Sequence, residues 1–138
     1  IKLQGQYTSA TCSVTQMAGV AALNGGIEPS RQMVQAFLRR RNLVVDLASQ
    51  IPGMKVNHPQ GAFYLFPDVS GLFGKKFGDR VIANAQDLTM YFLDEAHVAT
   101  VAGNAFGSPE CIRFSYATDD VKLTEAMRRL KVAVEQLT

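Results

Sequence analysis

The sequence lacks the features that direct a chain to a membrane or a nucleic acid. No apolar stretch approaches the roughly eighteen residues that a membrane-spanning helix needs, and Ile1 to Gln4 begin no signal-peptide pattern. The 14 basic and 12 acidic residues leave a net charge of +2, which is too even for a nucleic-acid-binding surface. We therefore expect a protein that binds neither membranes nor nucleic acids.

Cysteine and histidine are also scarce. The two cysteines, Cys12 and Cys111, have neither CxxC nor zinc-ligand spacing, so we expect no metal site and reduced thiols in a cytoplasmic protein. His58 and His97 stand in no motif with a nucleophilic serine or cysteine. Nothing in the sequence therefore favours a hydrolase.

What the chain does contain is typical of a globular domain. Apolar residues make up 47% and charged residues 19%, and 138 residues fit one domain. Arginines at positions 39–41 form the only run of one charge. Because this run lies in a helical pattern, we interpret it as a solvated helix face.

The hydrophobic pattern predicts an α/β fold. We expect helices over residues 13–24, 29–51 and 86–97 and from Asp119 onward, and strands over residues 54–56, 62–66, 98–101 and 112–116. Ser13 and Gln16 have the form of a capping box, and residues 68–83 read as an irregular loop or broken helical turn. This order predicts a two-layer, α+β-like unit with a small mixed or antiparallel sheet covered by helices.

The last predicted strand, within CIRFSYA, carries an arginine in an apolar run. Alternation places Ile112, Phe114 and Tyr116 on one face and Arg113 and Ser115 on the other. A guanidinium matches a carboxylate bidentately, so an arginine held on a strand makes a good carboxylate receptor. From this run alone, however, a solvated arginine on a half-exposed strand is the simpler interpretation.

Three motifs in fixed order change that interpretation. Residues 61–68 read GAFYLFPD, residues 101–107 read VAGNAFG, and residues 112–117 read IRFSYA. Together they resemble the C-terminal part of the class I aminotransferases, pyridoxal-phosphate enzymes of the aspartate aminotransferase fold. Residues 3–9 and 12–16 also resemble the loop and helix that end the family's large domain.

The resemblance covers nearly the whole chain but only about the last third of a full enzyme, so we expect a fragment. It implies that residues 1–27 are the tail end of the large-domain region and that residues 28–138 are the C-terminal small domain. Without a large domain, the apolar surface of Met17, Val20 and Leu23 would lose its usual partner. We expect this segment to pack differently, to swap between chains or to dimerise.

The resemblance also implies site residues. The family position matched by Arg113 binds the α-carboxylate of the substrate. Phe63 could approach the substrate cleft, with a core aromatic on the sheet as the alternative. Thr8 and Ser9 match a loop near the active site, cofactor and dimer partner, although their hydroxyls could instead cap the helix at Ser13.

The implied cofactor of the full-length enzyme is pyridoxal 5'-phosphate. The Ser-x-x-Lys motif of the family's Schiff-base lysine is absent from this chain. We therefore expect no catalytic residue here, no cofactor bound to the fragment and no activity from the fragment alone.

The parent protein is expected to be a homodimeric transaminase acting on amino acids and 2-oxo acids, of the aspartate/2-oxoglutarate type. Two alternatives stay open at this point. One is an aromatic or alanine aminotransferase, and the other is a non-catalytic, stand-alone assembly or binding domain.

Overall fold

The computed structural model describes residues 2–8 and 10–138. Contacts divide the chain into two compact units, one ending at Val34 and the other spanning Gln35–Thr138. The division falls inside helix α3 (Glu28–Ala48), whereas the sequence places a domain boundary just before this helix.

The first unit contains α1 (Lys2–Tyr7) and α2 (Ser13–Asn24). Helix α1 lies where a loop was predicted, and the loop prediction is wrong. Lys2, Leu3 and Gln4 are good helix formers, which explains the helical conformation. The Thr8 hydroxyl donates to the Gln4 carbonyl oxygen at 2.9 Å and closes the helix.

Helix α2 begins at the predicted residue, but the predicted capping box does not form. Cys12 occupies the N-cap position and its side chain makes no capping hydrogen bond. The amide of Gln16 instead donates to the Thr11 carbonyl oxygen, with an Nε2–O distance of 2.7 Å. Ser13 is already the first helical residue, and a capping hydroxyl belongs one position earlier.

Apolar side chains of α2 face solvent. Met17, Val20 and Leu23 are 68%, 50% and 86% exposed, and no residue of α2 is buried. A helix without a buried face gains little from packing, and most helical stability in proteins comes from such packing. Helix α2 therefore has no core of its own.

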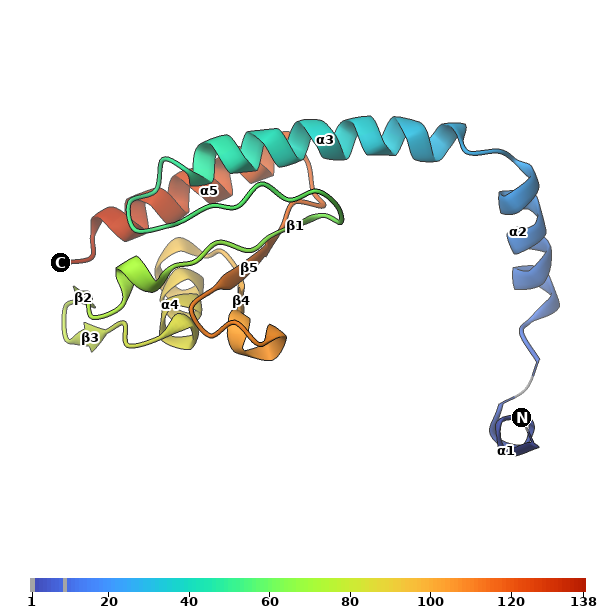
Figure 1. Ribbon diagram of the computed structural model, residues 1–138, viewed down its shortest axis with the longest axis horizontal. Helices are drawn as coiled ribbons and strands as arrows, with labels where there is room; N and C mark the ends of the chain where they lie inside the picture. The colour runs from blue at the N-terminus through green and yellow to red at the C-terminus, as the bar shows by residue number, and fades with distance from the viewer. Residues whose placement is uncertain (1, 9) are drawn as a thin grey trace. The chain divides into compact units, whose positions relative to one another are not determined.

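A three-stranded antiparallel sheet lies at the centre of the second unit (Figure 1). Its strands are β1 (Tyr64–Leu65), β4 (Val101–Ala102) and β5 (Ile112–Ser115), in the order β1-β5-β4. The observed sheet confirms the prediction of a small antiparallel sheet within an α/β fold, although each strand is shorter than predicted.

Helices pack against this sheet. Beyond Val34, α3 runs beside α5 (Asp120–Glu135), and α4 (Ala85–Tyr91) continues into a π-helical turn, η2 (Phe92–Ala96), that contacts α5 (Figure 1). The Tyr91 hydroxyl donates to the Ala133 carbonyl oxygen at 2.8 Å and ties α4 to α5. The largest fully buried side chains come from all parts of the unit: Tyr91, Phe92, Ile51, Leu65, Leu72, Ile82, Leu88, Ile112 and Leu130.

The arginine run of α3 is more than a solvated face. Arg39 and Arg40 both pair with Asp120 at the start of α5, with N–O distances of 2.9 and 3.5 Å. Arg41 donates to the Pro59 carbonyl oxygen at 3.2 Å. The run therefore connects α3 to two other segments of the unit.

Residues 54–56 form no strand, contrary to the prediction. Only an isolated bridge joins Lys55 to Asp68. The Asp68 carboxylate accepts hydrogen bonds from the Ser70 backbone N–H at 2.8 Å and from Lys55 Nζ at 3.1 Å. These hydrogen bonds lower the pKa of Asp68 to about 2. Asp68 forms a turn with Ser70, so the chain leaves the extended conformation and the pairing with residues 54–56 is limited to Lys55.

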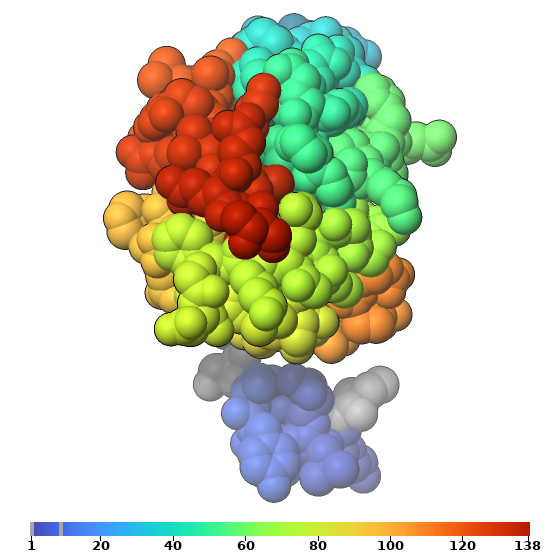
Figure 2. All heavy atoms as spheres, turned by 90° about the vertical axis from the view of Figure 1, so that its left-hand side faces the viewer, coloured from blue at the N-terminus to red at the C-terminus, as the bar shows by residue number. Residues whose placement is uncertain are grey.

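Residues 68–83, predicted to be irregular, contain a 3-10 turn, η1 (Ser70–Leu72), and a hairpin of β2 (Lys76–Phe77) and β3 (Arg80–Val81). The chain end adds to this hairpin, since Lys76 and Thr138 exchange two backbone hydrogen bonds of 2.9 Å. Figure 2 shows the last residues (red) against this yellow-green segment.

Ala62 has a left-handed backbone, with φ 58°. Tyr116 holds this conformation, because its hydroxyl donates to the Ala62 carbonyl oxygen at 3.1 Å and its N–H to the Phe63 carbonyl oxygen at 2.9 Å. Such a conformation costs an L-residue about 1–2 kcal/mol. The strain lies directly before β1.

Replacing Ala62 with glycine should raise the free energy of unfolding by up to about 1 kcal/mol, since the strain disappears while glycine loses more entropy on folding. Urea unfolding measures the change. Ala126→Gly, inside α5, is the matched control and should lower stability by about 1 kcal/mol. Equal destabilisation by both variants would contradict the interpretation of Ala62 as strained.

Candidate functional site

Arg113 lies on β5, the central strand, and faces away from the core. Its neighbours Ile112 and Phe114 are 0% and 5% exposed, whereas Arg113 is half-buried and Ser115 is exposed. The predicted alternation of this strand is therefore confirmed. The guanidinium projects from the central strand, which pairs with β1 on one side and with β4 on the other.

Two aromatic rings contact the Arg113 guanidinium. Its Cζ lies 4.3 Å from the ring centroid of Tyr64 and 4.1 Å from that of Phe106. Tyr64 pairs with Ser115, so it is the diagonal neighbour of Arg113 across the β1–β5 ladder. Phe106 ends the 3-10 turn η3 (Gly103–Phe106), which follows β4. Rings and guanidinium at these distances attract each other as cation–π pairs.

A tight loop brings Phe106 to this position. Gly103 donates to the Cys111 carbonyl oxygen at 2.8 Å and accepts from Ser108 at 3.1 Å. A Cβ on Gly103 would lie 2.6 Å from the Cys111 carbonyl oxygen, so only glycine fits. Gly107 has φ 78° and reverses the chain. The loop thus returns from β4 to β5 with Phe106 beside Arg113.

The charge of Arg113 has no counterion in the described part of the chain, where no carboxylate lies within ion-pair distance of it. Most other arginines differ: Arg39 pairs with Asp120 at 2.9 Å and Arg80 with Asp94 at 2.8 Å, while Arg41 donates to the Pro59 carbonyl oxygen at 3.2 Å. A half-buried guanidinium held by rings and not by a carboxylate can accept an external carboxylate without first breaking an ion pair.

Phe63 supports the site indirectly. It is 39% exposed, and its ring centroid lies 4.6 Å from that of Tyr64 and 5.9 Å from that of Phe37. Phe63 therefore contacts Tyr64, which in turn contacts Arg113. Its contact with a substrate stays a prediction.

Thr8 is exposed and belongs to the first unit. Its hydroxyl bonds within α1, so the alternative in which it caps the helix at Ser13 is not what forms. Ser9 lies outside the described residues. The role implied for this loop near the cofactor or dimer partner stays a prediction.

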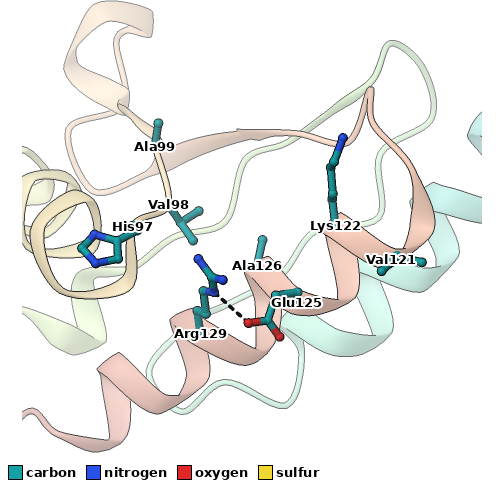
Figure 3. A pocket seen from close by; sticks show the side chains of 8 residues that line it. All are labelled: His97, Val98, Ala99, Val121, Lys122, Glu125, Ala126 and Arg129. Carbon is teal, nitrogen blue, oxygen red and sulfur yellow. Dashed lines mark hydrogen bonds and ion pairs between the residues drawn. The ribbon is translucent and has the colours of Figure 1, made fainter.

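A groove of about 420 Å³ lies between residues 97–99 and α5 (Figure 3). Arg129 pairs with Glu125, one turn earlier on α5, with an Nε–Oε1 distance of 2.8 Å (Figure 3), and Lys122 pairs with Asp119 at 3.2 Å. Arg128 and Arg129 together lower the pKa of Glu125 to about 2. The charged groups of the groove are therefore paired, and its one histidine, His97, has its ring Nδ1 3.3 Å from the Leu93 carbonyl oxygen.

The residues present fit a carboxylate but not the aldehyde of pyridoxal phosphate. No lysine in residues 2–8 and 10–138 is buried, and Lys55 pairs with Asp68. An amine that condenses with a carbonyl is usually activated by desolvation or by a cationic neighbour. Within the same residues, no group of three potential metal ligands comes together, and no helix is both long and apolar enough to cross a bilayer.

Comparison with known proteins places this geometry in a family. Residues 1–130 match the family model described as aminotransferase class I and II. The chain belongs to this family, whose class I members depend on pyridoxal phosphate.

Several relatives carry specific names. The chain is 43% identical over 137 residues to a bifunctional aspartate aminotransferase and glutamate/aspartate-prephenate aminotransferase of Petunia hybrida, covering 96% of this chain and 29% of that protein. It is 41% identical over 138 residues to an aspartate aminotransferase of Rhizobium meliloti, covering 99% and 33%. The chain therefore spans about a third of the length of these relatives.

Solved structures agree. The structure of an aspartate aminotransferase from Rhizobium meliloti superposes with a TM-score of 0.94 at 39% identity, covering 99% of this chain and 34% of that one. An alanine aminotransferase from Pyrococcus furiosus superposes with a TM-score of 0.77 at 28% identity, covering 87% and 29%.

Sequence reasoning missed two residues of the site, Tyr64 and Phe106. Both stand inside the motifs that carry the resemblance, but neither was assigned a role. Tyr64 shares a face with Arg113 only because β1 pairs with β5 in this register, and local sequence patterns do not give that pairing. Phe106 is positioned by a loop, which they do not give either.

Proposed function

We propose that this chain is the part of an amino-acid transaminase, of the aspartate/2-oxoglutarate type, that binds the substrate α-carboxylate at Arg113. The observation that carries the proposal is the half-buried guanidinium on β5, contacted by two rings and without a carboxylate partner in the described residues. The names of the relatives from Petunia hybrida and Rhizobium meliloti support the same substrate class.

Arg113 would act by binding and orientation. Its N–H fork can donate two parallel hydrogen bonds to one carboxylate, which fixes the plane of that group. Fixing the carboxylate also fixes the direction of the neighbouring Cα–H bond, and such orientation is a large part of rate enhancement. The rings of Tyr64 and Phe106 exclude water from the guanidinium faces, which strengthens these hydrogen bonds.

The chemistry of amino transfer belongs to pyridoxal phosphate, which supplies an electron sink when bound. The lysine that binds its aldehyde is not among the described residues, so we propose that the rest of the protein supplies it. The family resemblance also leads us to propose that residues 1–27 belong to the large-domain region of a homodimeric enzyme and that residues 28–138 form its small domain.

We propose a cytoplasmic location, with which the free thiols of Cys12 and Cys111 agree.

Steady-state assays on the full-length protein test the proposal. With 2-oxoglutarate as acceptor, aspartate should be the preferred amino donor in a panel that includes alanine, phenylalanine and tyrosine. Prephenate belongs in the panel of acceptors, because the name of the Petunia hybrida relative includes it.

The panel separates the alternatives. Preference for alanine or for the aromatic donors would assign the protein to another transaminase specificity while leaving the role of Arg113 intact. A full-length protein without the Ser-x-x-Lys motif and without transamination of any donor would overturn the proposal in favour of a non-catalytic binding domain.

A further inference from the structure

Arg113 differs from the other arginines in what fixes its position. Arg39 and Arg80 are held by carboxylates at 2.9 and 2.8 Å, whereas Arg113 has only ring contacts, at 4.3 and 4.1 Å, among the described residues. A long side chain without a fixed partner samples many rotamers, and ordering it on binding costs free energy. Whatever orders Arg113 beforehand therefore affects ligand affinity.

Each of the two rings is itself supported by another ring. Phe106 meets Phe66 edge-on, with centroids 6.0 Å apart and an interplanar angle of 89°. Tyr64 packs against Phe63 in a tilted arrangement, with centroids 4.6 Å apart and an interplanar angle of 42°. Such aromatic pairs add stability beyond the area that they bury, so the two rings are restrained although Phe106 is 46% exposed.

We propose that Tyr64 and Phe106, here called the aromatic clamp, are positioning residues that hold the Arg113 guanidinium so that its N–H edge is presented to the substrate carboxylate. The proposal rests on the proposed function of Arg113. A ring attracts the flat face of a guanidinium, whereas the hydrogen-bond donors lie in its plane. The clamp therefore orders the cation without using the donors that a carboxylate needs.

The two clamp residues come from opposite sides of β5. Tyr64 comes from β1, and Phe106 follows β4, whose Val101 is opposite Arg113. Arg113 is thus restrained by a ladder neighbour on one side and a loop residue on the other. If either ring is removed, the guanidinium keeps only one ring contact and its side chain gains rotational freedom.

Removing either ring in the full-length protein should weaken carboxylate binding. Phe106→Leu and Tyr64→Leu should each raise the inhibition constant of succinate, a simple dicarboxylate, and the KM for aspartate by about 3- to 30-fold, with a smaller change in kcat. Phe106→Tyr and Tyr64→Phe keep the rings and should stay within about threefold of the unaltered protein. Phe77→Leu is the matched control, because the Phe77 ring packs against Tyr91 and not against Arg113.

A double-mutant cycle separates positioning from a general structural effect. Combining Arg113→Lys with Phe106→Leu should cost clearly less than the product of the two single effects, because lysine has no guanidinium plane to orient. Purely multiplicative effects, or a loss in Phe106→Leu equal to that in Phe77→Leu, would overturn the clamp. Impairment by Arg113→Lys with unaltered ring variants overturns the clamp alone, whereas an unaltered Arg113→Lys enzyme overturns the proposed function.

Discussion

Replacing Arg113 with lysine in the full-length protein should lower kcat/KM for aspartate by about ten- to several-hundred-fold. Lysine keeps the positive charge but loses the planar fork, so the carboxylate is held by fewer hydrogen bonds and at a different angle. Hydrogen bonds between charged groups are worth roughly 1.5–3 kcal/mol each, and one or two of them account for the expected loss.

A thermal melt provides the stability control for this variant. Arg113 makes no ion pair within the described residues, so its replacement should change stability by less than about 1 kcal/mol. Arg128→Lys, on the exposed face of α5, is the matched control for activity and should leave kcat/KM unchanged. An unaltered kcat/KM in Arg113→Lys would return Arg113 to the status of a solvated strand residue.

The second large effect is expected at Gly103. Gly103→Ala should lower the free energy of unfolding by about 3 kcal/mol, because the new methyl group overlaps the carbonyl oxygens of Ser108 and Cys111. Backbone carbonyls cannot turn aside as a flexible side chain can. The loop must open, and Phe106 should move away from Arg113 with it.

Urea unfolding measures the loss of stability, and Gly61→Ala is the matched control. A Cβ on Gly61 would meet no atom within 4 Å, so that variant should change stability by less than about 0.5 kcal/mol. If Gly103→Ala matched Gly61→Ala in stability, the close packing of the 103–111 loop would be refuted.

The sequence predicted the parts of this fold that depend on periodicity. The alternation along β5 needs only neighbouring residues, and it correctly placed Ile112 and Phe114 inside and Arg113 outside. A helix was expected from Asp119 onward; α5 begins at Asp120, and Asp119 is its N-cap, whose side chain accepts the Lys122 N–H at 2.9 Å. A buried stripe and a cap are both local signals.

The failures share a different cause. The capping box predicted at Ser13 does not form, because the N-cap lies one position earlier, at Cys12. The hairpin of residues 76–81 was predicted to be a loop, because two-residue strands carry too little alternation to detect. In place of the strand expected at residues 54–56, the structure has a single β-bridge at Lys55. Each outcome depends on a contact with a distant segment or on the exact start of an element.

The candidate site also has one residue that the sequence predicted and two that only the structure shows. Arg113 could be selected because its motif resembles a family, and its face followed from strand periodicity. The ring of Tyr64 required the pairing of β1 with β5, and the ring of Phe106 required the return path of a loop. Neither pairing nor loop path is encoded in a local pattern.

The pairing of the sheet also sets the order in which the second unit can fold. β1 and β5 join Tyr64 to Ser115 across some fifty residues, whereas α5 is built from contacts within a few residues of each other. Closing a long loop costs chain entropy before the contact repays it, so long-range pairing is slow. We therefore expect the contact between Tyr64 and Arg113 to form late, so that Tyr64→Leu should accelerate unfolding more than it slows folding in stopped-flow measurements.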